Sequence, residues 1–90
     1  RSTQARVNLA NALAVAGRFQ EAAAEFRRLL KEPQNADNPA LLNNHGVVLF
    51  RMDRTEEAIA QFRRALAINP DLQDARDSLE TAIKSRDQGR

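Results

Sequence analysis

The stretch GRFQEAAAEFRRLL, residues 17–30, returns in altered form as DRTEEAIAQFRRAL, residues 53–66. The offset between the two stretches is 36 residues (53 − 17), and the same offset relates the residues that precede them. Apolar residues recur in both at the spacing of one face of an α-helix. Self-similarity at a period of this length is typical of repeat proteins built from stacked helical units.

Each copy is expected to form two helices. Asn38 is a good N-cap for a helix, and Pro39 suits the first helical position after it. Thr55 is expected to cap the next helix, and Pro70 to end it because proline cannot continue a helix. The four helices that these signals predict cover about residues 3–15, 19–32, 39–51 and 55–68.

A fifth helix is expected after the second copy, over about residues 72–85, with Asp71 as its N-cap. Its apolar residues form one stripe at helical spacing, and its other residues are charged or hydroxylated. One apolar stripe beside a polar face is typical of a helix that caps the open end of a solenoid. The residues of the stripe are Leu72, Ala75, Leu79, Ala82 and Ile83.

With these features in place, the sequence resembles the tetratricopeptide repeat family, whose unit is a helix pair with a sparse signature. Residues 39–72 fit one unit without a gap, residues 3–36 fit more loosely, and residues 73–86 resemble the terminal capping helix. The resemblance implies an all-α fold: a right-handed α-solenoid of antiparallel helix pairs, with five helices in a single domain, residues 1–90. The matching positions of the second copy are Gly46, Leu49, Ala58, Phe62, Ala65 and Pro70.

The matched residues also make physical sense without the family. Gly46 and Ala58 are small residues on partner helices, which can therefore approach closely at their crossing. Phe26 and Phe62 are expected to fill the space between one helix pair and the next. His45, the single histidine of the chain, is expected to be half-buried near the crossing and to add mild pH sensitivity to the fold.

Amide side chains recur on the first helix of each copy, on the face that lines the concave groove in the resembled family. Asn8 and Asn44 stand in register, and an asparagine amide both donates and accepts hydrogen bonds, so it can bracket a peptide backbone. We therefore expect a protein or peptide ligand on this face. The alternative is that these amides bond neighbouring turns or face water. The expected peptide-binding residues are Gln4, Asn8, Asn11, Val15, Asn43, Asn44, Val47, Phe50 and Arg51.

One ligand class of the resembled family is not expected. Chaperone-binding members clamp an acidic C-terminal carboxylate with two asparagines and several basic residues. Asn11 and Asn44 fall at the asparagine positions, but Val7, Asp74 and Ser78 occupy the basic ones. A clamp without cations should not hold an acidic tail.

Composition argues against several other functions. The net charge of +2 is too balanced to indicate a nucleic-acid or membrane surface. The arginine pairs at residues 27–28 and 63–64 are interpreted as a solvated face, balanced by Glu25, Glu32 and Glu57. One histidine and no cysteine cannot build a metal site, and no nucleophile–base–acid set is present. We expect no catalysis, no cofactor and no small-molecule substrate. Nucleic-acid binding through these arginine pairs, which lie on the convex side of the expected fold, is a less favoured alternative.

The sequence contains no apolar run long enough to span a membrane, and nothing near Arg1 resembles a signal peptide. The chain is interpreted as a piece of a longer protein, with a cytoplasmic location as the default expectation. The alternative to peptide binding is a structural spacer or self-association module. In that case the first helix, with Val7, Leu9 and Leu13, would pack on a preceding repeat or form a homo-oligomer.

Overall fold

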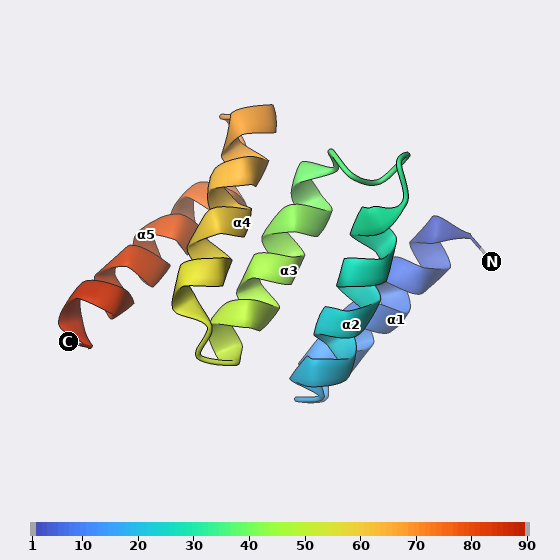
Figure 1. The fold of residues 1–90 in the computed structure, drawn as a ribbon, viewed down its shortest axis with the longest axis horizontal. Coiled ribbons are helices and arrows are strands. Elements are labelled where there is room, and N and C mark those ends of the chain that lie inside the picture. Colours follow the sequence, from blue (N-terminus) through green and yellow to red (C-terminus); the bar gives the residue numbers. More distant parts are fainter. Residues whose placement is uncertain (1, 90) are drawn as a thin grey trace.

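The computed structural model describes residues 2–89, and within that range the chain consists of helices and turns without a strand (Figure 1). The expected all-α architecture is confirmed, and the helices are paired as antiparallel hairpins, α1 with α2 and α3 with α4. The fifth helix follows the second hairpin. The elements are α1 (Thr3–Val15), α2 (Phe19–Lys31), α3 (Pro39–Arg51), α4 (Thr55–Ile68) and α5 (Gln73–Gln88).

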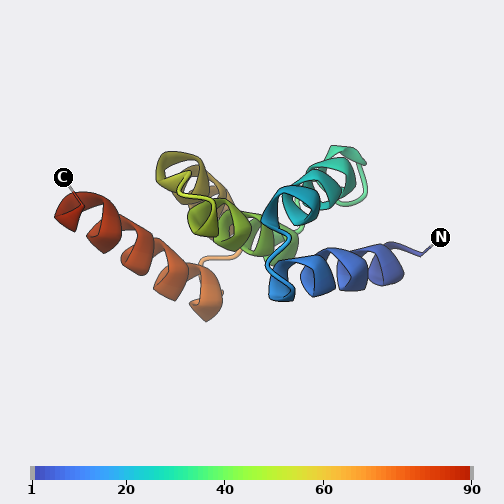
Figure 2. The ribbon, with the colours of Figure 1, turned by 90° about the horizontal axis from the view of Figure 1, so that it is seen from below.

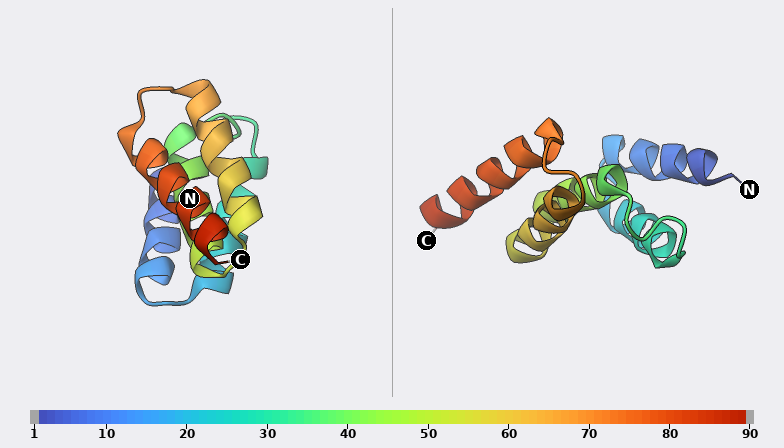
Figure 3. Two further views of the ribbon diagram at one scale, coloured as in Figure 1. Left: turned by 90° about the vertical axis from the view of Figure 1, so that its left-hand side faces the viewer. Right: turned by 90° about the horizontal axis from the view of Figure 1, so that it is seen from above.

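The helices are arranged along the long axis in the order of the sequence, in a body of 42 × 28 × 18 Å (Figure 1). Two side views show α2 and α4 on one side, α1 and α5 on the opposite side, and α3 between them (Figures 2 and 3). The central helix α3 contacts each of the other four helices. Over residues 2–89, α2 does not contact α4 and α1 does not contact α5, so the stack is held mainly by neighbours.

The two hairpin turns share one backbone conformation. Gly17 and Asp53, at equivalent positions of the two copies, have φ angles of 82° and 67°, in the left-handed region. The amide of the following residue donates to a carbonyl five residues back, at 2.8 Å in the first turn and 2.9 Å in the second. This bond satisfies a carbonyl at the end of the preceding helix, which explains why both helices stop there.

The start of α3 follows the sequence prediction, whereas the start of α4 does not. The side-chain Oδ1 of Asn38 accepts hydrogen bonds from the backbone amides of Ala40 at 3.0 Å and Leu41 at 3.3 Å, which confirms the expected cap. Thr55 is the first residue inside α4, and Arg54 occupies the cap position without a side-chain cap bond. The prediction that Thr55 caps α4 was therefore wrong.

At the cap positions of α2 and α4 stands an arginine that pairs with a glutamate in the first turn of the helix. The Nε of Arg18 lies 2.6 Å from Glu21, and the Nε of Arg54 lies 2.9 Å from Glu57. The glutamates also lie where the positive end of the helix dipole favours an acid. The two ion pairs are repeated at the same offset, and the second one stands at the start of α4, where Thr55 was expected to cap the helix.

The start of α5 also differs from the prediction. The helix begins at Gln73, with Leu72 in the cap position and no side-chain cap bond, so Asp71 is not its cap. Asp71 lies instead in the preceding turn, where its backbone amide donates to Oδ1 of Asn69 at 3.1 Å. The side chain of Asn69 thus fixes the geometry of this turn, and the helix begins at Gln73, one residue later than predicted.

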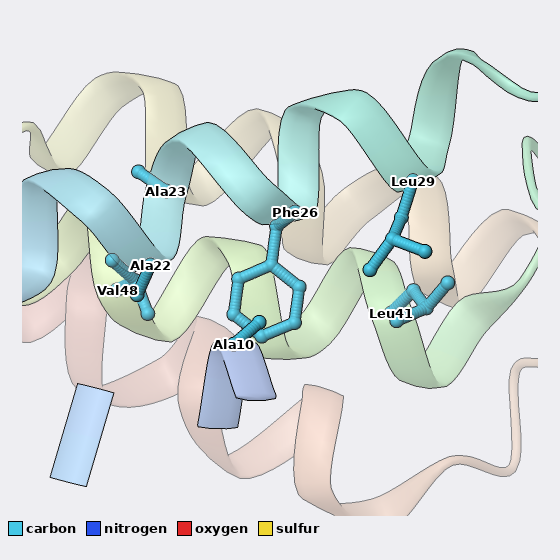
Figure 4. Close-up of a cluster of buried hydrophobic side chains, with 7 residues drawn as sticks. All are labelled: Ala10, Ala22, Ala23, Phe26, Leu29, Leu41 and Val48. Atoms are coloured by element: carbon cyan, nitrogen blue, oxygen red, sulfur yellow. The ribbon is translucent and has the colours of Figure 1, made fainter. Parts of the chain in front are cut away.

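The core is built from small residues facing phenylalanine rings. In the first hairpin the ring of Phe26 points from α2 toward Ala10 on α1 (Figure 4). In the second hairpin Gly46 stands at the equivalent position, and a Cβ atom added there would lie 2.5 Å from Cε1 of Phe62. Phe62 therefore packs directly over the bare backbone of α3. Each ring also reaches the next element along the stack, because Phe26 clusters with Leu41, Val48 and other buried residues and Phe62 with Ala82.

Candidate functional site

A trough runs between α3 and α5. One part of the trough, which we call the upper cavity, has a volume of about 250 Å³. Its floor is formed by Val47, Phe50 and Phe62, and its wall by Asp77, Ser78 and Thr81. Phe50 and Thr81 also line a second cavity of about 550 Å³, which extends the trough along the last turns of α5. The trough thus combines an apolar floor on α3 and α4 with a polar wall on α5.

The groove was expected to run along the first helices and the capping helix, but no residue of the α5 wall was among the predicted peptide-binding residues. Ser78, Thr81 and Ser85 are spaced i, i+3 and i+7, which places the three hydroxyls on one face of the helix. This spacing was visible in the sequence and is the signal that would have found the wall. Phe62 was predicted only as a core residue, yet it also forms part of the cavity floor.

The predicted site residues of α1 are exposed, and two of them bond each other. The Nε2 of Gln4 donates to Oδ1 of Asn8 at 2.9 Å, across one helical turn. For this pair the structure agrees with the alternative hypothesis, in which the amides bond neighbouring turns of the helix. Asn11 and Val15 are exposed on the same helix. The structure therefore leaves Asn11 and Val15 accessible to a ligand, and Gln4 and Asn8 accessible as a bonded pair.

The predicted site residues of α3 do not all lie in the trough: some line it, one is buried, and one contacts α2. Val47 and Phe50 line the trough, and Asn44 is half-buried. Asn43 was expected at the edge of the accessible face, but it is only 7% exposed, because neighbouring helices pack over this part of α3. The guanidinium of Arg51 lies 5.2 Å from the centre of the Phe19 ring, which directs it toward α2.

His45 is more buried than expected. It is 6% exposed, its ring centre lies 6.3 Å from that of Phe26, and neither ring nitrogen has a hydrogen-bond partner. Burial lowers the pKa of His45 from 6.5 to about 4, and the charge of Arg27 acts in the same direction. Weaker effects on this pKa come from Glu57, which raises it, and from Arg64 and Arg54, which lower it. The imidazole is therefore neutral at pH 7.

The arginine pairs at residues 27–28 of α2 and 63–64 of α4 are exposed, as expected, but their acidic partners differ from the prediction. Arg28 pairs with Glu25 at 2.5 Å, as the spacing indicated. Glu32 pairs instead with Arg6 of α1 at 2.6 Å. Glu57 pairs with Arg54 at the start of its own helix, so neither acid balances the arginine pairs. The reason is that both acids have an arginine in closer reach, across the hairpin or within the first turn.

Within residues 2–89 no group of three potential metal-ligating side chains gathers in one place. None of the helices in this range has both the length and the apolar character needed to cross a membrane.

Stacked antiparallel helix pairs that touch mainly their neighbours define a helical repeat protein. A family model described as tetratricopeptide repeat matches residues 7–73, which is more than half of the chain, so the chain belongs to the tetratricopeptide repeat family. Repeats of this family generally mediate protein–protein interactions and typically form non-catalytic scaffolds. A comparison with curated protein sequences found no match.

Proposed function

We propose that this chain is a protein–protein interaction module that holds a peptide or partner segment in the groove formed by α1, α3 and α5. The observation that carries the proposal is the trough between α3 and α5. Val47 is 39% exposed there, beside the half-buried Phe50, so an apolar floor is open to an incoming side chain. Partly exposed apolar residues within a concave, polar-rimmed surface are typical of binding sites.

The rigidity of the surrounding elements supports the same function. The floor and the wall lie on helices that are packed against each other, and α3 is held by all of its neighbours. A ligand therefore meets a surface that is already formed, and less conformational entropy is lost on binding. The exposed amides of α1 and the half-buried Asn44 extend the polar part of the groove, and we assign them to contacts with the ligand backbone.

A capture experiment with a matched control tests the proposal. The domain is immobilised as the wild type, as Val47→Asp in the groove and as Ile68→Asp at the end of α4. Ile68 is 43% exposed, close to the value for Val47, but it does not line the trough. We expect partners from a cell extract to bind the wild type and Ile68→Asp and to be lost from Val47→Asp. Thermal melts establish that all three are folded. Equal capture by the three forms would refute groove binding.

A second function, self-association through α1, is favoured by one observation. Leu9 is 46% exposed on the first helix, although Val7 and Leu13 of the same helix pack partly against the core. A second copy could cover this leucine. Sedimentation over a concentration series tests the idea: association should appear in the wild type and disappear in Leu9→Ser. A monomer at all concentrations would exclude it.

A further inference from the structure

We propose that the trough between α3 and α5 selects peptides in which an apolar side chain stands next to a lysine or arginine. The inference rests on the proposed function and adds a ligand chemistry to it.

The apolar anchor follows from the lining of the upper cavity. Val47, Phe50 and Phe62 contribute only carbon atoms to its floor, and the volume of about 250 Å³ suits one leucine, methionine or phenylalanine side chain. Burying such a side chain removes apolar surface from water, so we expect the anchor to contribute most of the binding free energy. A charged side chain on this floor would be desolvated without a partner beneath it.

The neighbouring charge follows from Asp77. It is the one charged residue that lines the upper cavity, and its Oδ1 accepts a hydrogen bond from Nε2 of Gln73 at 2.8 Å. Within residues 2–89 no cation pairs with Asp77, or with Asp74 nearly one turn earlier. All six glutamates of the chain, by contrast, are ion-paired: Glu21, Glu25, Glu32, Glu56, Glu57 and Glu80.

A buried amide on the same side of α3 does not contribute to this preference. Asn43 shares a face of α3 with Val47 and Phe50, at spacing i, i+4 and i+7. Its Oδ1 is buried and has no hydrogen-bond partner. Because this atom is buried and Asn43 does not line the trough, a ligand cannot reach it without displacing the neighbouring helices.

The ligand preference therefore rests on the carboxylate of Asp77, which favours a ligand that carries a cation. A lysine or arginine beside the apolar anchor would supply a cation to Asp77, and the backbone amides of an extended peptide would supply further donors. An acidic residue at the same place would meet a like charge. The cation at the far end of the trough, Lys84, is already 3.5 Å from Glu80, so it does not offset this preference.

Selection from a random dodecapeptide display library tests the proposal. The targets are the wild type, Asp77→Lys, Val47→Asp, and Asp37→Lys as a control with the same charge change at an exposed loop residue outside the trough. We expect the wild type and Asp37→Lys to enrich an apolar residue adjacent to Lys or Arg. Asp77→Lys should lose the basic preference, and Val47→Asp should no longer enrich the apolar residue.

A titration of one selected peptide then measures the charge contact. Replacing its basic residue with norleucine should weaken binding to the wild type about two- to five-fold and leave binding to Asp77→Asn unchanged. Peptides that depend on Val47 but show no basic preference would overturn this inference and leave the proposed function standing. If no selected peptide depends on Val47, both the inference and the proposed function fail.

Discussion

Acid should destabilise this domain through His45. The imidazole is buried beside Phe26, without a hydrogen-bond partner for either nitrogen, and its pKa is lowered from 6.5 to about 4. In the unfolded chain the pKa returns to about 6.5, so between pH 6.5 and 4 the unfolded state binds a proton that the folded state excludes. The stabilising contribution of the neutral imidazole is complete above pH 6.5 and is lost as the pH falls toward 4.

The size of the effect follows from the two pKa values. Each pH unit inside this window lowers the free energy of unfolding by about 1.4 kcal/mol, and the loss between pH 7 and pH 5 is about 2 kcal/mol. In a domain of this size such a loss lowers the melting temperature by about 10 °C.

The assay is urea unfolding followed by circular dichroism at pH 7, 6 and 5, because the chain has no tryptophan or tyrosine for fluorescence. His45→Leu is the matched control, since it keeps an apolar side chain of similar size and removes the titrating group. The variant should be at least as stable as the wild type at pH 7, because two unpartnered buried nitrogens are gone. It should lose little stability down to pH 5. An equal loss in both proteins would refute the assignment to His45.

Five further substitutions, in three groups, have expected outcomes in thermal or urea unfolding. Gly46→Ala should lower the free energy of unfolding by about 1 kcal/mol, because a Cβ atom 2.5 Å from a buried ring costs more than the gain in helix propensity; a more stable variant would contradict the packing. Asp53→Gly should stabilise by about 0.5–1 kcal/mol and Gly17→Ala should destabilise by about 1 kcal/mol, since both positions have left-handed backbone. Opposite signs would contradict the turn geometry. Asn38→Ala should cost about 1 kcal/mol while Thr55→Ala stays near neutral, and equal costs would restore Thr55 as a cap.

The architecture could be predicted because its signals are local and repeated. The cap at Asn38, the proline at its first helical position and the matched small and aromatic residues all specify the same hairpin. The cap predictions at Thr55 and Asp71 failed for a different reason. An N-cap is chosen by the geometry of the preceding turn, and at these two places an arginine–glutamate pair and the amide of Asn69 determine that geometry.

The candidate site could be predicted only in part, because burial depends on residues distant in sequence. Helical spacing placed Val47 on one face of its helix with Phe50 flanking it, and the family resemblance implied that this face lines the groove; both residues do line the trough. Asn43 lies on the same face but is buried, which depends on how neighbouring helices pack against α3. The hydroxyl spacing on α5 was visible in the sequence, but the placement of α5 beside α3 was expected from the family resemblance and not from a local pattern. Whether the predicted residues bind a peptide stays a prediction.

The position of α3 links the site to the cooperativity of folding. If α1 or α5 unfolds locally, only its contacts with two neighbouring helices are lost. Displacing α3 instead breaks its contacts with all four other helices. Amide protons of α3 should therefore exchange with solvent only when the whole chain unfolds. A partner seated on the trough rests on this helix, so its binding free energy adds to global stability by mass action and protects the array from proteolysis.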